Sequence, residues 1–229
     1  MIPWSQIDTS RVPGADVELR LMQRGAEFSM MLGQNELMNS RLSGSEEALA
    51  TLACRRINDV KHPHLLIGGL GMGFTLRAAL AVLDAQARIT VAELVPAVIA
   101  WARGPLAHIF GNSLTDPRTH IREVDVVDMI KASSSAFDAI LLDVDNGPEA
   151  LIRKANDALY DLKGLRSIRR ALRPGGILAV WSSGPNAAFS KRLGSADFEV
   201  NEVGVRATTK RTGARHVIWF ATKPRPASR

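Results

Sequence analysis

The sequence HLLIGGLGMGFTLR, residues 64–77, joins a short apolar run to a glycine-rich turn and a good helix former. Leu65–Ile67 are typical of a buried strand, and residues 74–83 predict the helix that follows. Strand, glycine loop and helix begin a βαβ unit, a motif that holds nucleotides at the loop. Glycine suits this loop because it permits a positive φ and, lacking Cβ, lets the backbone approach a ligand.

The glycine spacing narrows the class of ligand. Gly69, Gly71 and Gly73 form G-x-G-x-G, whereas the dinucleotide fingerprint is G-x-G-x-x-G and Phe74 occupies its last position. A second predicted strand, residues 88–93, ends in Glu93, whose carboxylate can accept both ribose hydroxyls of an adenosine. NAD and S-adenosylmethionine (SAM) share that ribose, but the spacing favours SAM-type ligands. The alternative is a plain strand-to-helix turn that binds no ligand, and it does not explain why an acid, Glu93, ends the second strand.

The rest of the chain alternates between strand and helix patterns. Without a helix between them, the last two strands are expected to pair antiparallel. The predicted fold is α/β: a Rossmann-like, mostly parallel seven-stranded sheet with an antiparallel C-terminal strand pair, plus a short N-terminal β-hairpin. The strands are expected at 64–68, 88–93, 120–124, 139–143, 177–182, 198–205 and 216–222, and the helices at 45–57, 74–83, 96–103, 126–131, 161–172 and 186–193.

Three segments are expected. Residues 1–43 are the least regular, with a β-hairpin formed by 27–32 and 36–40 around Gly33-Gln34-Asn35. Residues 44–222 form the nucleoside-binding α/β domain. Residues 223–229 form a basic, disordered tail.

Composition excludes several functional classes. The net charge is +6, and much of the excess positive charge lies toward the C-terminal end of the sequence. No aromatic residues interleave with the basic stretch 206–215. A solvated surface therefore explains the charge better than nucleic acid does. No apolar run of about eighteen residues and no secretory signal occur, so no membrane partner is expected. The single cysteine, Cys54, fits a reducing cytoplasm, and no Cys/His cluster has metal-ligand spacing.

Acids follow the predicted strands at the edge where α/β sheets bind ligands. Asp125 fits two roles, acceptor for an adenine amino group and N-cap of the next helix. Asp143 ends the apolar run AILLD, which gives no other cause for a carboxylate there, so a functional role is favoured over a turn. Asp145 fits a turn and a site equally well.

Five stretches together resemble the spermidine synthase family of aminopropyltransferases, which share the SAM-dependent methyltransferase fold. The resemblance covers about residues 40–184 in one order. The stretches are IGGLGMGFTLR, VAELVP, EVDVVDM, FDAILLDVDNGP and LYDLKGLRSIRRALRPGGILAVWS.

The resemblance implies roles for several residues. Gly69, Gly71 and Gly73 match the family's glycine loop. Glu93 matches its ribose-binding acid and Asp125 its adenine-contacting acid. Asp143 matches the first acid of its D-x-x-D catalytic loop.

Three departures concern the reacting end of the site. Met72 stands where the family carries an aspartate that holds the ammonium of decarboxylated SAM. Asn146 stands where the proton-accepting aspartate is expected, and Asp145 lies one residue away. Helix 45–57 lacks the tyrosine and histidine that the family presents to the polyamine.

The sequence therefore predicts a spermidine synthase-like transferase that uses SAM or decarboxylated SAM, without a metal, and transfers an aminopropyl group to a small amine acceptor. One alternative is a SAM-dependent methyltransferase, because methyl transfer relies less on a dedicated base. Another is a catalytically idle nucleoside-binding protein. An NAD-linked enzyme is disfavoured by Phe74. The departures predict that true spermidine synthase activity is weak or absent. The sequence is compatible with a homodimer and leaves the oligomeric state open.

Overall fold

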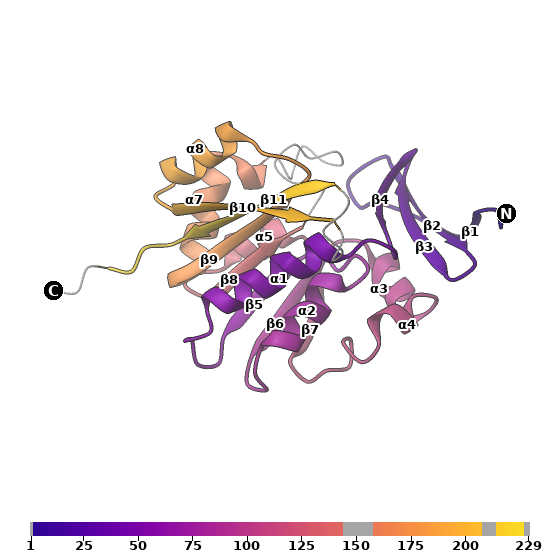
Figure 1. The fold of residues 1–229 in the computed structure, drawn as a ribbon, viewed down its shortest axis with the longest axis horizontal. Coiled ribbons are helices and arrows are strands. Elements are labelled where there is room, and N and C mark those ends of the chain that lie inside the picture. The colour runs from indigo at the N-terminus through magenta and orange to yellow at the C-terminus, as the bar shows by residue number, and fades with distance from the viewer. Residues whose placement is uncertain (1, 144–157, 208–213, 227–229) are drawn as a thin grey trace.

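The molecule is built on two β-sheets (Figure 1). The structure is a computed structural model, and it describes residues 2–143, 158–207 and 214–226. The larger sheet has the strand order β10-β11-β9-β8-β5-β6-β7, and the N-terminal sheet has the order β1-β2-β3-β4. No helix within these ranges is long and apolar enough to cross a membrane.

The seven-stranded sheet has the predicted topology. β5 pairs parallel with β6 and β8, β6 with β7 and β8 with β9, whereas β11 is antiparallel to both β9 and β10. Chain order therefore reverses between β5 and β8, which is where such sheets bind ligands. The strands are β5 His64–Gly68, β6 Arg88–Glu93, β7 Thr119–Glu123, β8 Phe137–Leu142, β9 Leu172–Ser182, β10 Glu199–Arg206 and β11 Arg215–Thr222.

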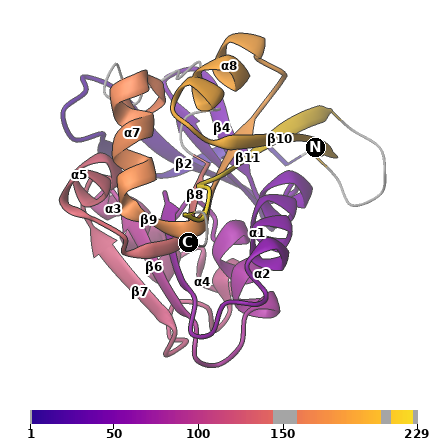
Figure 2. The same cartoon turned by 90° about the vertical axis from the view of Figure 1, so that its left-hand side faces the viewer.

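Helices cover both faces of this sheet. Figure 2 shows α1 and α2 on one face and α5 and α7 on the opposite face. Side-chain caps begin three of the helices: Asp125, Asp161 and Asn186 each accept a hydrogen bond from a backbone N–H of the first turn. The helices are α1 Gly44–Arg56, α2 Phe74–Val82, α3 Pro96–Arg103, α4 Ala107–Phe110, α5 Val126–Ala132, α7 Leu162–Ala171 and α8 Ala187–Ser195.

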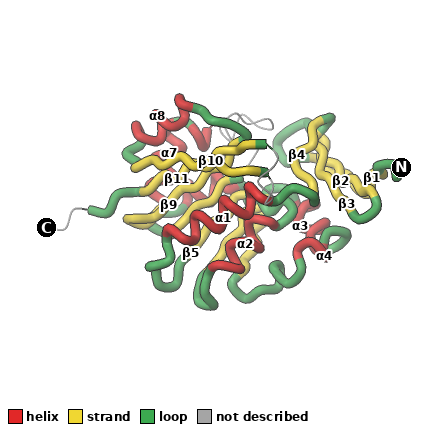
Figure 3. The backbone as a smooth tube through the Cα atoms, viewed as in Figure 1, coloured by secondary structure: helices red, strands yellow, loops and turns green. Residues whose placement is uncertain are grey.

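The N-terminal sheet is larger than the predicted hairpin. Strands β3 (Glu27–Leu32) and β4 (Asn35–Asn39) are that hairpin, and β1 (Ser5–Arg11) and β2 (Glu18–Arg24) extend it into four antiparallel strands (Figure 3). Its buried side chains join the same hydrophobic cluster as α1, α2 and α3. The indole Nε1 of Trp101 on α3 donates to Asp8 Oδ2 on β1 over 2.7 Å, a hydrogen bond that joins the N-terminal sheet to α3.

The chain after α7 differs from its prediction at one boundary. Residues 173–176, Arg-Pro-Gly-Gly, were expected to separate helix from strand, but β9 begins at Leu172, directly after α7. Beyond β11, Lys223 continues the pairing: its N–H donates to Gly176 O over 2.9 Å, and its carbonyl accepts from Gly175 N over 2.8 Å. The predicted tail thus begins with contacts to the sheet.

Candidate functional site

A cavity of about 200 Å³ lies at the carboxyl ends of β5, β6 and β8. The glycine loop after β5, the ends of β6 and β8, and the first turn of α1 form one side. The other side comes from the N-terminal sheet and the turn that joins β1 to β2, through six apolar side chains: Val12, Leu19, Met30, Leu32, Leu37 and Met38. Both parts of the fold are therefore needed to enclose it.

The glycine loop is shaped by the protein's own side chains. Gly69, Gly71 and Gly73 have φ values of 86°, 50° and 77°, which L-residues rarely adopt. A Cβ on Gly73 would lie 2.3 Å from Phe110 Cε1, and one on Gly71 would lie 2.8 Å from Met38 Cε. All three glycines line the cavity, as predicted for a ligand-binding loop.

Glu93 joins this loop to the end of β6. Its Oε2 accepts from Leu70 N and its Oε1 from Val95 N, both over 2.8 Å. Burial raises the pKa of Glu93, while these backbone N–H groups act in the opposite direction. The backbone N–H groups of Leu94 and Gly71 also act on this carboxylate, so the protein itself supplies several donors to it. Glu93 thus has a structural role that the sequence did not reveal, and it lines the cavity.

Asp125 fills one of the two predicted roles, the N-cap of α5. Its Oδ1 accepts from Val127 N over 2.8 Å as the N-cap of α5. The same residue lines the cavity, on the side of Glu93 and the glycine loop.

Asp143 follows β8 directly and lines the cavity together with Glu46 from the first turn of α1. Burial and the nearby Glu46 carboxylate raise the pKa of Asp143 to about 8. Burial also raises the pKa of Glu46, whose Oε2 accepts from Ser45 Oγ over 2.7 Å. Glu46 was not predicted as a site residue. The predicted Asp145, and the Asn146 substitution, lie outside the described residues.

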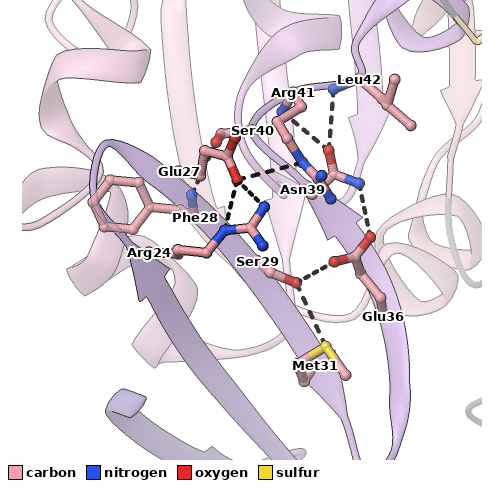
Figure 4. Close-up of polar contacts among 10 residues, drawn as sticks. All are labelled: Arg24, Glu27, Phe28, Ser29, Met31, Glu36, Asn39, Ser40, Arg41 and Leu42. Carbon is pink, nitrogen blue, oxygen red and sulfur yellow. Dashed lines mark hydrogen bonds and ion pairs between the residues drawn. The ribbon is translucent and has the colours of Figure 1, made fainter. Parts of the chain in front are cut away.

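A polar network fixes the segment between β3 and α1 (Figure 4). Glu36 accepts from Ser29 Oγ over 2.7 Å and from Asn39 Nδ2 over 2.8 Å. Asn39 Oδ1 then accepts from the backbone N–H groups of Arg41 and Leu42, over 3.0 and 3.1 Å. The network therefore holds Met38 against the glycine loop and sets the entry to α1, which carries Glu46.

The charge of the cavity is opposite to that of the chain. Among the described residues that line it, every charged one is an acid: Glu46, Glu93, Asp125 and Asp143. The side chains of Met72, 1% exposed, and Trp181, 8% exposed, add apolar surface to the cavity lining. An acidic, largely apolar cavity favours cationic ligands with an apolar body. Within the part of the chain described, no group of three or more His, Cys, Asp or Glu is placed to hold a metal.

Residues 44–190 match the spermine/spermidine synthase domain family. Polyamine aminopropyltransferase 1 of Streptomyces coelicolor is 31% identical over 126 residues, which cover 54% of this chain and 23% of that protein. The polyamine aminopropyltransferase of Sulfolobus acidocaldarius is 27% identical over 123 residues, 54% of this chain and 39% of that protein. The match thus spans well under half the length of these curated relatives.

Solved structures share the fold over nearly the whole chain. The crystal structure of spermidine synthase from Thermotoga maritima has a TM-score of 0.73 at 16% identity and covers 96% of this chain and 73% of that one. A crystal structure of spermidine synthase in complex with the transition-state analogue AdoDATO has a TM-score of 0.74 at 18% identity, with the same coverage. At these identities the likeness concerns the fold.

Proposed function

The chain belongs to the spermine/spermidine synthase domain family, and we propose that it transfers an aminopropyl group from decarboxylated SAM to a small amine. The observation that carries this proposal is the cavity at the β5/β8 reversal, in which every charged lining residue described is an acid. A sulfonium nucleoside with an ammonium tail and an amine acceptor are both cationic. Such a cavity attracts both.

The nucleoside end of the donor lies along the glycine loop in this proposal. The ribose hydroxyls lie against the Glu93 carboxylate, which also accepts backbone N–H groups of the loop. Asp125 accepts from the adenine amino group while it caps α5. The reacting carbon then points toward Asp143 at the end of β8. These roles follow the family pattern and stay proposals for this chain.

Methyl transfer from SAM is the second candidate, and Met72 favours it. Met72 is a buried apolar side chain on the cavity wall, so no carboxylate at that position selects for a decarboxylated donor. Methyl transfer has the same displacement geometry and depends mainly on alignment of donor and acceptor. We propose that the protein works in the cytoplasm, because a single, buried free thiol at Cys54 suits a reducing compartment. We also propose that it forms a homodimer.

Thermal melts with single ligands test the donor site. At about 100 times its dissociation constant, a bound ligand stabilises the fold by roughly 2.7 kcal/mol. We expect 5′-methylthioadenosine and decarboxylated SAM to raise the melting temperature and NAD to leave it unchanged. A shift with NAD and none with the three sulfur nucleosides, SAM included, would contradict the proposal. Mass spectrometry of the products then distinguishes aminopropyl from methyl transfer.

A further inference from the structure

Strand β10 forms one edge of the seven-stranded sheet. On one side it pairs with β11 over its full length, from Glu199↔Thr222 to Arg206↔Arg215, without a shift in register. Within the described ranges no strand pairs with its other side, and five of its eight residues are exposed. The outer N–H and C=O groups of β10 are therefore placed to pair with another extended chain.

The three other edge strands of the two described sheets are protected against such pairing. The register of β1 shifts between Gln6 and Asp8, and that of β4 shifts opposite Met30 and Met31. Strands β4 and β7 are also only five residues long. Bulges and short strands keep sheet edges from associating. Strand β10 has neither device, and no proline or lysine occurs in it.

Helices cover β10 on both faces and leave its edge open. Asn201 Oδ1 accepts from Arg56 of α1 over 3.0 Å, whereas Glu202 Oε2 accepts from Ser190 Oγ of α8 over 3.3 Å. Figure 2 shows these two helices on opposite sides of the strand. Successive side chains of a strand point to opposite faces, so the odd-numbered residues of β10 face α1 and the even-numbered residues face α8.

The charges of β10 match those of a second copy of this chain in one register. Two copies that pair antiparallel at this edge are related by a twofold axis perpendicular to the sheet, and residues directly opposite each other share a face. An axis at Gly204 sets Glu202 opposite Arg206 of the second copy, and the same pair forms again across the axis. Val203 then lies opposite Val205. An axis at Glu202 would set two carboxylates against each other, and no other axis through a residue of β10 sets an acid of the strand opposite its arginine.

We propose that two copies of this chain join their seven-stranded sheets edge to edge through β10, with Gly204 on the twofold axis. The backbone pairing runs from Glu202 to Arg206 in both copies. Charges of both signs along the edge oppose pairing in other registers and favour this one. The inference assigns the interface of the proposed homodimer, and it holds whichever group the protein transfers.

This interface adjoins the wall of the cavity. The carbonyl of Ala207, directly after β10, accepts from Gly44 N over 3.1 Å. Gly44 begins α1, whose first turn contributes Glu46 to the cavity lining. A second copy paired with β10 therefore lies beside the segment that positions the first turn of α1.

A cysteine at residue 204 tests the axis directly. No atom lies within 4 Å of the Cβ position of Gly204, so Gly204→Cys should fold. Residues directly opposite each other in an antiparallel pair have Cα atoms about 4.5–5.5 Å apart, which suits a disulfide. We expect the oxidant diamide to convert this variant into a covalent dimer on a nonreducing gel.

Two controls accompany the cross-link. Residue 199 of one copy would lie roughly 30 Å from residue 199 of the other, so Glu199→Cys should give no cross-link. The wild type, whose Cys54 is buried, should give none either. Equal cross-linking of Glu199→Cys and Gly204→Cys, or no cross-linking of Gly204→Cys, would overturn the inference.

Sedimentation velocity of the full chain at micromolar concentration tests the interface without a cross-link. We expect the wild type to be a dimer and Gly204→Lys, which sets two ammonium groups on the axis, to be a monomer with an unchanged far-UV circular dichroism spectrum. Gly194→Lys is the matched control, because its Cβ position is equally open but lies on α8, and it should stay a dimer.

Two sedimentation results would contradict the inference. A dimeric Gly204→Lys would mean that the copies meet through another surface, and a monomeric wild type would exclude the homodimer altogether. Neither result bears on the transfer reaction, which the thermal melts with 5′-methylthioadenosine test separately.

Discussion

Met38 on β4 lies directly over Gly71 in the glycine loop, so close that a Cβ on Gly71 would stand 2.8 Å from its Cε and 2.9 Å from its Sδ. The N-terminal sheet and the nucleotide-type loop thus touch at a point where a Cβ on residue 71 would force the end of the Met38 side chain to shift. The polar network around Glu36 and Asn39 keeps β4 in this position.

We expect Gly71→Ala to lower the free energy of unfolding by about 1–3 kcal/mol, because φ is +50° and the Met38 side chain is in the way. Urea unfolding measures the loss. Gly33→Ala is the matched control, since Gly33 has φ +55° with nothing near its Cβ position and reports the backbone term alone. Equal losses at both positions would mean that contact with Met38 contributes nothing.

Glu93→Gln should weaken 5′-methylthioadenosine binding more than it weakens the fold. Hydrogen bonds to a charged group contribute about 1.5–3 kcal/mol each, and two ribose hydroxyls depend on this carboxylate. Glu93→Gln sets an amide NH2 against one of the N–H groups of Leu70 and Val95, and Glu93→Ala removes both acceptors, so both variants should also cost stability, the alanine variant more. Calorimetry and urea unfolding separate the two effects. Unchanged affinity in folded Glu93→Gln would leave Glu93 only its loop-holding role.

Stability should fall as pH rises through about 8, where Asp143 ionises in the folded state. The folded pKa lies above the ordinary value, so the folded protein binds more protons than the unfolded chain between these two values. Asp143 therefore costs least stability below pH 4 and most above pH 8, with a slope of at most about 1.4 kcal/mol per pH unit for one proton. Urea unfolding from pH 6 to pH 9 should show this slope in the wild type. If Asp143→Asn showed the same slope, a group other than Asp143 would be its cause.

Met72→Asp should change which donor is preferred. The new carboxylate can pair with the ammonium of decarboxylated SAM and repels the carboxylate of SAM, so the ratio of the two dissociation constants should move toward the decarboxylated donor. The variant should be less stable without ligand, since residue 72 is buried in a cavity whose described lining already includes four acids. Calorimetry with both donors measures the ratio, and Met72→Leu is the control. If the ratio of the two dissociation constants stayed the same, the ammonium of decarboxylated SAM would not lie beside residue 72.

The positions of the seven strands along the chain were predictable because each central strand is a compact apolar run and each connection carries turn residues. Strand β1 was missed because it is exposed along almost its whole length, which erases the alternation that predicts a strand. Strand β2 was missed although Leu19 and Leu21 alternate with less buried residues. The start of β9 was misplaced because Pro174 and the two following glycines also punctuate a helix end.

Gly69, Gly71, Gly73, Glu93, Asp125 and Asp143 line one cavity, which their positions after predicted strands anticipated. Glu46 was not predicted, since an acid in the first turn of a helix is explained locally by the helix dipole. The sequence predicted only that Trp181 lies in a strand. Their proximity to Asp143 depends on how α1 lies across β8 and β9, and no local pattern encodes that packing.

The acidic cavity inside a chain of net charge +6 has a kinetic consequence. A cationic ligand far from the protein meets the net positive field, and it is attracted only once it is within about a Debye length, some 10 Å at 0.1 M salt, of the carboxylates. Added salt screens the outer repulsion more than the buried attraction. Stopped-flow mixing should therefore show association with decarboxylated SAM accelerating as ionic strength rises, the reverse of ordinary electrostatic steering.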